Sequence, residues 1–332
     1  MHTVFVTGGA GFIGSHLVDR LVKCADVDHV TVLDALTYAG DRRNLTEAEC
    51  SDKVRFIHGD IRDHDTVSAV LPGHDWVVHL AAESHVDRSL IDVGQSVRTN
   101  VMGTQALLDV AMRAGVDKVV HVSTDEVYGP LPTGAAAEDA PLRPTVPYAA
   151  SKACSDLLAA SYYVSCGVPV CITRSSNNYG PRQHPEKLIP RFLGLLLSGQ
   201  QVTVHGRGRH LRNWLHVEDN CRAIEQVLRV GVPGETYNIG GGTDLTTIEL
   251  TKLLLQATGR DADAITYVPD RPANDIRYSM TWDKIAALGF APARDLAAGL
   301  AATVAWYRQH PERLAPITPA EATEAELDGV PA

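Results

Sequence analysis

Short runs of β-branched and apolar residues recur along the first half of the chain and alternate with longer stretches of helical periodicity. The runs fall at residues 3–8, 30–35, 54–60, 76–82, 118–124 and 169–175, and a helical pattern over about 14–23 follows the first. Such alternation is typical of βαβ units, in which parallel strands carry helices on both faces of one sheet. The runs at 76–82 and 118–124 are almost continuously apolar, which favours central strands buried on both sides. We therefore predict an α/β fold with a doubly wound parallel sheet.

The pattern changes after Ser175, where a turn-rich stretch, a helical segment and a short strand indicate a second, smaller α/β region. A further helix and strand within about 213–240 are expected to return to the first sheet. We predict one domain over 1–175 plus about 213–240, and an interleaved second domain over 176–212 plus about 241–314. Residues 315–332 are rich in Pro, Ala, Glu and Thr and are expected to form a flexible tail.

Charge and cysteine usage narrow the class of protein. The formal net charge is −10, so the chain offers no bulk basic surface for nucleic acid or anionic lipid. None of the six cysteines forms a C-x-x-C pair, as expected for reduced thiols in the cytosol. No stretch reaches about 18 consecutive apolar residues, and the start of the chain passes directly into a strand pattern. We expect a cytoplasmic protein without a membrane, nucleic-acid or metal site.

A glycine-rich turn follows the first predicted strand. In the stretch VTGGAGFIGSH, Gly8, Gly11 and Gly14 stand between a strand and a helix, and Gly9, Gly11 and Gly14 also satisfy G-x-G-x-x-G. Such a turn needs glycine for its backbone angles, for the close approach of a pyrophosphate and for packing of the helix on the strand. The amides at the start of the helix can then receive the phosphates of a dinucleotide.

The ends of the next strands supply the other predicted contacts of a dinucleotide. Asp34 lies 20 residues after Gly14, where a carboxylate hydrogen-bonds a ribose 2′-hydroxyl and repels a 2′-phosphate. This spacing favours NAD over NADP, although Arg42 and Arg43 follow nearby and leave NADP open. Two further strand ends carry candidate contacts. Asp60 and Ile61 follow the third strand, at a position suited to flank the adenine ring. Ala81 and Ala82 follow the fourth strand, where the backbone must pass close to the cofactor.

Two groups of polar residues are candidates for chemistry. Tyr148 and Lys152 lie four residues apart in a helical pattern and therefore on one face. An adjacent ammonium and a nicotinamide cation would lower the pKa of the phenol, which would then accept a proton from an alcohol while a hydride leaves. Asp125 and Glu126 follow a buried strand directly, and one acid beside another suits work that needs one carboxyl protonated and the other ionised.

Taken together, these motifs resemble the dTDP-glucose 4,6-dehydratases, which are extended short-chain dehydrogenases/reductases. The stretches that carry the resemblance span most of residues 1–310: TGGAGFIGSH, AAESHVDRS, TNVMGT, VSTDEVYG, PYAASKA, SNNYGPRQHPEKLIP and YNIGG. The resemblance implies a Rossmann-type fold, a tightly held NAD and a nucleotide-sugar substrate. It also assigns the first predicted domain to NAD and the second to the nucleotide sugar.

The mechanism implied by the resemblance uses five residues. Tyr148, supported by Lys152, removes the C4 hydroxyl proton while the C4 hydride passes to NAD, and Thr124 hydrogen-bonds the C4 oxygen. The 4-ketone acidifies the C5 hydrogen, which Glu126 takes, and Asp125 protonates the departing C6 hydroxyl. NADH then returns the hydride to C6, giving a 4-keto-6-deoxy sugar.

The resemblance also implies which residues hold the ligands. The predicted cofactor site comprises Gly8, Gly11, Phe12, Ile13, Gly14, Asp34, Asp60, Ile61, Leu80, Ala81, Ala82, Thr99, Tyr148, Lys152 and Asn178. The predicted substrate site comprises Ser84, Thr124, Asn177, Lys187, Leu188, Thr203, His205, Arg212, Asn238, Arg271 and Asn274. Arg212 and Arg271 would pair with the diphosphate, because charge-assisted hydrogen bonds are the stronger kind. His85 and Asp87 have a structural alternative, as caps of the following helix.

The chain departs from the family pattern at five positions near the predicted substrate. Arg182 and His205 stand where aromatic residues are common, Asn213 replaces an aspartate, and Ala273 and Asn274 replace Gly-His. These changes leave the acid-base residues intact but weaken the inference of thymine specificity. UDP or another nucleotide therefore remains open.

Three other functions were compatible with parts of the pattern. A nucleotide-sugar 4-epimerase needs only Tyr148, Lys152 and NAD, and a uronic-acid decarboxylase would keep a glutamate without the aspartate. A non-catalytic NAD-binding regulator would not need all four polar residues. The Asp125-Glu126 pair favours dehydration over both other enzymes, and the presence of all four polar residues argues against the regulator. Two helical segments that include 99–115 and 150–166 carry enough apolar positions for a homodimer interface of four helices, or equally for core packing.

Overall fold

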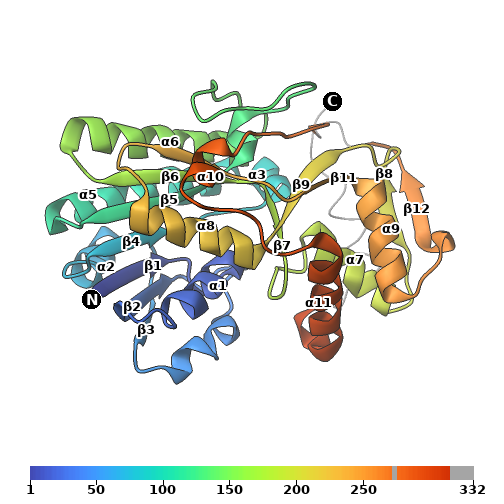
Figure 1. Cartoon of the computed structure of the whole chain (residues 1–332), viewed down its shortest axis with the longest axis horizontal. Helices are drawn as coiled ribbons and strands as arrows, with labels where there is room; N and C mark the ends of the chain where they lie inside the picture. The colour runs from blue at the N-terminus through green and yellow to red at the C-terminus, as the bar shows by residue number, and fades with distance from the viewer. Residues whose placement is uncertain (271–274, 315–332) are drawn as a thin grey trace.

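A seven-stranded parallel sheet forms the larger part of the molecule in the computed structural model, which describes residues 1–270 and 275–314 (Figure 1). Its order is β10-β6-β5-β4-β1-β2-β3, and every neighbouring pair is parallel. The strands are β1 (His2–Thr7), β2 (Val27–Asp34), β3 (Val54–His58), β4 (Trp76–His79), β5 (Lys118–Thr124), β6 (Val170–Ser175) and β10 (Thr236–Ile239). The predicted fold class and all six predicted strands are confirmed.

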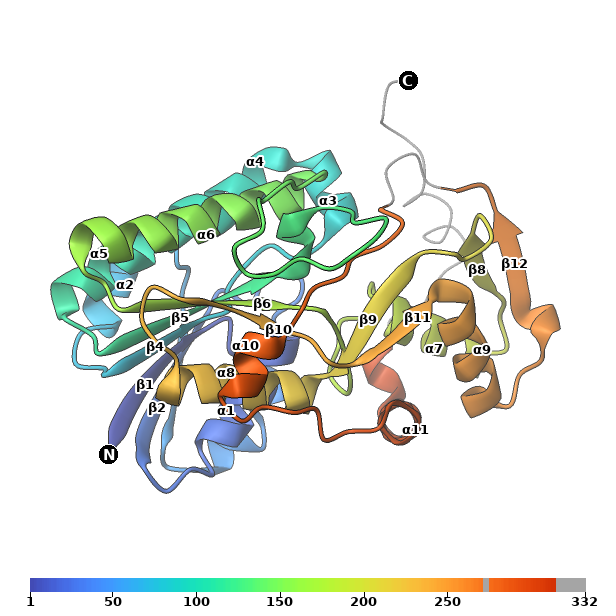
Figure 2. The ribbon, with the colours of Figure 1, turned by 45° about the horizontal axis from the view of Figure 1, so that its top comes forward.

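Helices cover both faces of this sheet (Figures 1 and 2). α1 (Phe12–Leu21) and α8 (Val217–Val230) pack side by side on one face, and α2 (His64–Val70), α5 (Thr104–Ala114) and α6 (Pro147–Cys166) lie on the other. β1 serves both layers, because Val4 and Val6 are buried with the α1 side and Phe5 with the opposite side. The first helix begins and ends two residues earlier than predicted, with Gly11 as its N-cap.

The second region is built on two small sheets. One has the order β11-β9-β7 and the other pairs β12 with β8. Its elements are β7 (Asn177–Tyr179), α7 (Leu188–Leu197), β8 (Val202–His205), β9 (Leu211–His216), β11 (Thr243–Thr246), α9 (Thr247–Thr258), β12 (Ile265–Val268) and α11 (Leu296–Gln309). Leu193, Leu250 and Tyr307 are fully buried in its own core. Between β9 and β11 the chain returns to the large sheet as α8 and β10, so the regions are interleaved, while the domain limits stay a prediction.

Short elements complete the described chain and include the segments that border the site. They are η1 (Arg42–Leu45), η2 (Ala48–Cys50), α3 (Val86–Ile91), α4 (Val93–Ser96), the π-helical η3 (Val97–Gly103), η4 (Asp125–Tyr128), η5 (Ala262–Ala264), α10 (Asp283–Ala287) and η6 (Pro311–Arg313). The predicted tail, 315–332, lies outside the described residues.

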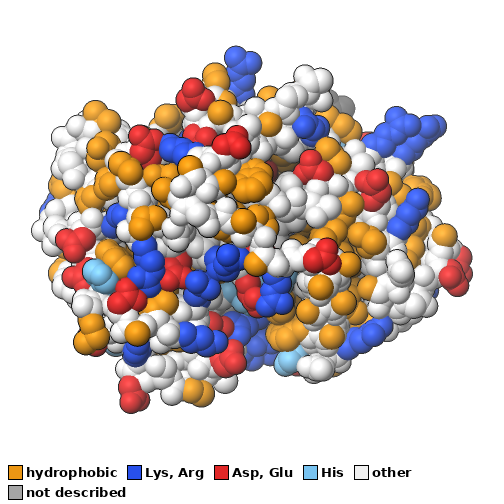
Figure 3. Space-filling view, in the orientation of Figure 1, with side chains coloured by type: hydrophobic (Ala, Val, Ile, Leu, Met, Phe, Trp, Pro, Cys, Tyr) orange, Lys and Arg blue, Asp and Glu red, His pale blue; other side chains and the backbone are white. Residues whose placement is uncertain are grey.

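The strand order reverses between β1 and β4, since the chain builds β2 and β3 on one side of β1 and then β4, β5 and β6 on the other. Loops that leave the carboxyl ends of β1 and β4 therefore diverge, and ligands of such folds bind in the crevice between them. Acidic and basic side chains are interspersed over the face in Figure 3. Within the described residues, no helix is both long and apolar enough to cross a membrane.

Candidate active site

The glycine turn after β1 leaves no room for side chains. Gly8 has a φ of +70°, and a Cβ on it would lie 2.6 Å from the backbone nitrogen of Ala81. A Cβ on Gly14 would overlap the carbonyl oxygen of Gly8. α1 starts at Phe12 without a side-chain cap, so its first amides are free to bind an anion. The turn therefore has the shape and the donors of a phosphate cradle.

Asp34 ends β2 beside this cradle and shapes the loop around it. One carboxylate oxygen accepts from the Ala10 amide and the other from the Leu36 amide, both at 2.9 Å. Burial raises the pKa of Asp34, and these two hydrogen bonds oppose the rise. Because a carboxylate has about four lone-pair sites, it can still accept from a ribose hydroxyl. The predicted role of Asp34 in recognising a dinucleotide is compatible with this geometry.

The other predicted cofactor residues differ in how their side chains are used. Ile61 is 3% exposed and belongs to the core, which leaves only its backbone for the predicted adenine contact. Asp60 is held by Arg62, with 2.6 Å between Oδ2 and the guanidinium. Thr99 lies on η3, and Ala81 follows β4 and donates its amide to Thr7. The Oδ1 of Asn178 is buried without a hydrogen-bond partner and is available to a ligand donor such as a carboxamide.

α6 presents the tyrosine and lysine predicted for proton transfer. Lys152 is 4% exposed, its Nζ donates to the Val122 carbonyl at 2.8 Å, and burial lowers its pKa to about 8 against the charge of Asp156. The pKa of Tyr148 is raised well above its ordinary value by burial and by the charge of Glu126, although a hydrogen bond with Thr124 opposes this. The prediction that the ammonium and a nicotinamide cation together lower the phenol pKa stays a prediction.

The two acids stand at the point where β5 turns into η4. The Thr124 hydroxyl accepts from the Glu126 amide and donates to the Asp125 carboxylate, each at 3.3 Å, and so caps the turn. Asp125 is 5% exposed, and burial followed by the charge of Glu126 raises its pKa to about 7. Burial also raises the pKa of Glu126, but the charges of Arg212 and Lys187 oppose it. Burial thus raises the pKa of both carboxyls, and the cations beside Glu126 oppose its rise.

The cations near Glu126 come from the second region. Lys187 is the N-cap residue of α7, and its Nζ donates to the Ser84 carbonyl at 2.5 Å. Arg212 lies on β9 and donates to the Asp275 carbonyl at 2.8 Å, with its guanidinium carbon 4.4 Å from the centre of the Tyr278 ring. The site therefore forms only where the two regions meet.

The other predicted substrate residues lie in the protein interior, on elements of the second region or outside the described residues. Asn238 is fully buried, and its amide accepts from the Tyr128 hydroxyl at 2.7 Å and donates to the Ala136 and Thr281 carbonyls. Asn238 supports η4 through Tyr128, and its side-chain amide is already hydrogen-bonded within the protein. Thr203 and His205 lie on β8 in the second region, while Asn177 opens β7 and Leu188 opens α7. Arg271 and Asn274 lie outside the described residues.

The structure also brings in residues that sequence reasoning did not select. Tyr38 contributes to the raised pKa of Tyr148. The guanidinium carbon of Arg88 lies 4.1 Å from the centre of the Tyr38 ring. Asp275 and Tyr278, joined by a 2.6 Å hydrogen bond, lie on the side of Glu126. Of these residues, only Tyr38 could have been selected from the sequence, because it follows the predicted cofactor residue Asp34 by four positions in the same loop. His85 caps α3 by accepting from the Arg88 amide, as its structural alternative predicted.

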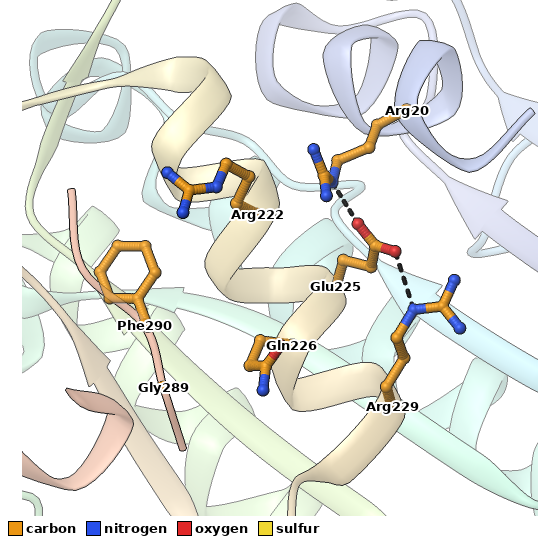
Figure 4. A pocket seen from close by; sticks show the side chains of 7 residues that line it. All are labelled: Arg20, Arg222, Glu225, Gln226, Arg229, Gly289 and Phe290. Carbon is orange, nitrogen blue, oxygen red and sulfur yellow. Dashed lines mark hydrogen bonds and ion pairs between the residues drawn. The ribbon is translucent and has the colours of Figure 1, made fainter. Parts of the chain in front are cut away.

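A surface pocket between α1 and α8 is lined by several arginines but carries balanced charge (Figure 4). Glu225 bridges Arg20 and Arg229, and Arg222 pairs with Asp219 at 2.7 Å. Since each guanidinium already has a carboxylate partner, this cluster ties the two helices together and offers no uncompensated cation. Across residues 1–270 and 275–314, no group of His, Cys, Asp and Glu is arranged to hold a metal ion.

The parallel sheet, the glycine turn and the Tyr-x-x-x-Lys helix define a short-chain dehydrogenase/reductase of the extended type. Residues 5–303 match the family model for GDP-mannose 4,6 dehydratase. The chain is 54% identical to a dTDP-glucose 4,6-dehydratase of Streptomyces griseus, over 96% of this chain and 97% of that one. It is 51% identical to the enzyme of that name from an Actinoplanes strain, over 92% and 97% of the two chains.

A solved structure agrees with these similarities. The dTDP-glucose 4,6-dehydratase of Streptomyces venezuelae, with NAD and a dTDP ligand bound, superimposes with a TM-score of 0.92 at 50% identity. The match covers 95% of this chain and all of the other. The chain belongs to the dTDP-glucose 4,6-dehydratase family, as its motifs predicted.

Proposed function

We propose that the protein is a hydro-lyase that uses NAD to convert dTDP-glucose to dTDP-4-keto-6-deoxyglucose and water. The observation that carries the proposal is the Asp125-Glu126 pair: a buried Asp125, whose pKa is raised to about 7, and a half-buried Glu126 lie beside Tyr148. An epimerase has no use for such a pair. The relatives named above carry the same activity in their names, and one binds NAD.

Each acid-base residue has one task in this reaction. NAD, when bound, supplies reversible storage of the hydride that leaves C4 and later enters C6. Tyr148 takes the C4 hydroxyl proton; burial raises the pKa of its phenol, and the positive charge of a bound nicotinamide would lower it. Glu126 takes the C5 proton, made acidic by the 4-ketone. Asp125 gives its proton to the C6 oxygen, which leaves as water.

The substrate is held through its diphosphate and its nucleoside. Arg212 and Lys187 face the same carboxylate, Glu126, and supply positive charge for the diphosphate and sugar. Thr203 and His205 on β8 are assigned to the base, and Arg271 is assigned to the diphosphate. Replacement of the usual aromatic by His205 keeps a flat ring for stacking on the base.

Incubation of the purified protein with NAD and dTDP-glucose, without added reductant, tests the function. We expect a 4-keto-6-deoxy product with the mass of the substrate less one water, detected by mass spectrometry. UDP-glucose and GDP-mannose are matched substrates, and we expect dTDP-glucose to have the highest kcat/KM. Formation of the C4 epimer with no change of mass would support the epimerase instead.

We further propose a homodimer formed through α5 and α6. The side of the molecule that carries these helices exposes large apolar residues, including Met102 at 60%, Leu157 at 63% and Val164 at 81%. Burying such a face in a symmetric interface would remove it from water. Sedimentation velocity is expected to give a dimer for the unaltered protein and a monomer for Leu157→Asp, whereas Val232→Asp, also exposed but beyond α8, should stay dimeric. A monomer in both cases would contradict the proposal.

We place the protein in the cytoplasm. All six cysteines are free in the structure, including the exposed Cys50, Cys154 and Cys166, as suits a reducing compartment. Cell fractionation with a tagged copy measures this directly, and recovery in a membrane or exported fraction would contradict it.

A further inference from the structure

A second cavity reaches Asp125 from outside the site described above. It has a volume of about 220 Å³, and its wall includes Asp125, Asn213, Asp244, Ser279, Trp282 and the glycines 240–242. Among the described residues, this rear cavity shares only Asp125 with the acid-base and cationic groups, since Glu126, Tyr148, Lys187 and Arg212 do not line it. Asp125 therefore borders this cavity and is also one of the two acids of the site.

The rear cavity connects a buried acid with solvent through polar groups. Asp125 is 5% exposed, whereas Asp244 on β11 is exposed. Asn213 donates to Asp244 at 2.7 Å and accepts from the Gly242 amide at 3.2 Å, which fixes its side chain in the cavity wall. A cavity of about 220 Å³ with these polar groups has room and hydrogen-bond partners for water.

The proposed reaction requires two things of Asp125: it gives a proton to the C6 oxygen, and it must then be protonated again. When the C6–O bond breaks, the oxygen keeps the electron pair and takes the Asp125 proton, so one water and one carboxylate result. The electrons of the C5–H bond form the C5=C6 bond, and Glu126 holds the proton until it returns to C5. Tyr148 retains the proton of the C4 hydroxyl and finally releases it to solvent. Asp125 must therefore gain one proton from another source before the next turnover.

We propose that the rear cavity accepts the water that leaves C6 and returns a proton to Asp125 in every turnover. This inference rests on the proposed dehydratase function. In this scheme water in the cavity reaches Asp125 while the sugar is bound. Asn213 and Ser279 are positioning residues, because they line the cavity and act on Asp125 through water.

Filling the cavity separates this role from substrate binding. Ser279→Leu adds an apolar side chain to the cavity wall, and Ser279→Ala is the matched control that keeps the space open. With NAD bound, the first turnover of dTDP-glucose is followed by the absorbance of reduced nicotinamide, which rises on C4 oxidation, and the steady-state kcat reports the later turnovers. We expect Ser279→Leu to leave the rise of the first turnover unchanged and to lower the steady-state kcat by about tenfold or more, because each later turnover needs a reprotonated Asp125.

A second variant guards against misfolding of the first. Asn213→Leu keeps the side-chain size but dries the wall, and its steady-state kcat should fall in the same way. An unchanged steady-state kcat in both folded variants would overturn the inference and would route the proton through Thr124, which lies 3.3 Å from Asp125. A first-turnover rise slowed as much as the steady-state rate would also overturn it. Absence of any product from the unaltered protein would instead overturn the proposed function, and the inference with it.

Discussion

Replacement of Asp125 by Asn together with Glu126 by Gln is expected to slow water loss by about 10³-fold or more, since one general acid or base contributes about 10²–10⁴-fold. Oxidation at C4 depends on Tyr148. Its rate should change only about a few-fold, because the double variant alters the charge near Tyr148 but not the base itself. In single-turnover experiments reduced nicotinamide should therefore form and persist. The amides preserve size and hydrogen bonding, so the site should keep its shape.

The matched control is Asp28→Asn, which removes a carboxylate from an exposed position of β2. It should leave both steps unchanged. Equal slowing of oxidation and water loss in the double variant would show that the two acids do not act as assigned.

The pH dependence of water loss follows from the same pair. The pKa of Asp125 is raised to about 7, and the acid works only while protonated, so the rate should fall as the pH rises through this value. The fall should be absent in Asp125→Asn, which has no proton to lose. A stopped-flow pH series on water loss, compared with C4 oxidation in the same samples, measures this difference.

Replacement of Tyr148 by Phe is expected to reduce C4 oxidation by at least about 10³-fold, because it removes the group assigned to take the hydroxyl proton. Almost no reduced nicotinamide should appear, and the later steps cannot begin. Tyr163→Phe is the matched control on the same helix, since its side chain is 39% exposed and lies about four turns from Tyr148. The rate of reduced nicotinamide formation and the thermal midpoint are measured for both. Substantial oxidation by Tyr148→Phe would remove the assigned base.

Local patterns predicted the large sheet and the ends of its strands well, because strand runs, glycine turns and helix periodicity are encoded within a few residues. Gly8, Gly14 and Asp34 were found in this way, as were Tyr148 and Lys152 on α6. The two small sheets were not predicted in detail, because β9 pairs with β7 and β11 across long sequence separations. No short window of the sequence records such pairing.

Burial accounts for the remaining differences. Asn238 is polar and lies in a motif, yet the fold uses its amide beneath η4. Ile61 stands at a strand end, yet its side chain belongs to the core. The high pKa of Tyr148 follows from desolvation by surrounding residues. Each of these properties depends on neighbours from distant parts of the chain, which a linear pattern does not reveal.

The return of the chain to the large sheet as α8 and β10 constrains how the enzyme can be recombined with its relatives. β10 is the edge strand beside β6, and α8 covers one face of the sheet, although both follow the first part of the second region in sequence. A chimaera that exchanges everything after Ser175 would replace part of the parental sheet along with the sugar-binding half. Grafting a new specificity therefore requires two separate inserted segments, one on each side of α8 and β10.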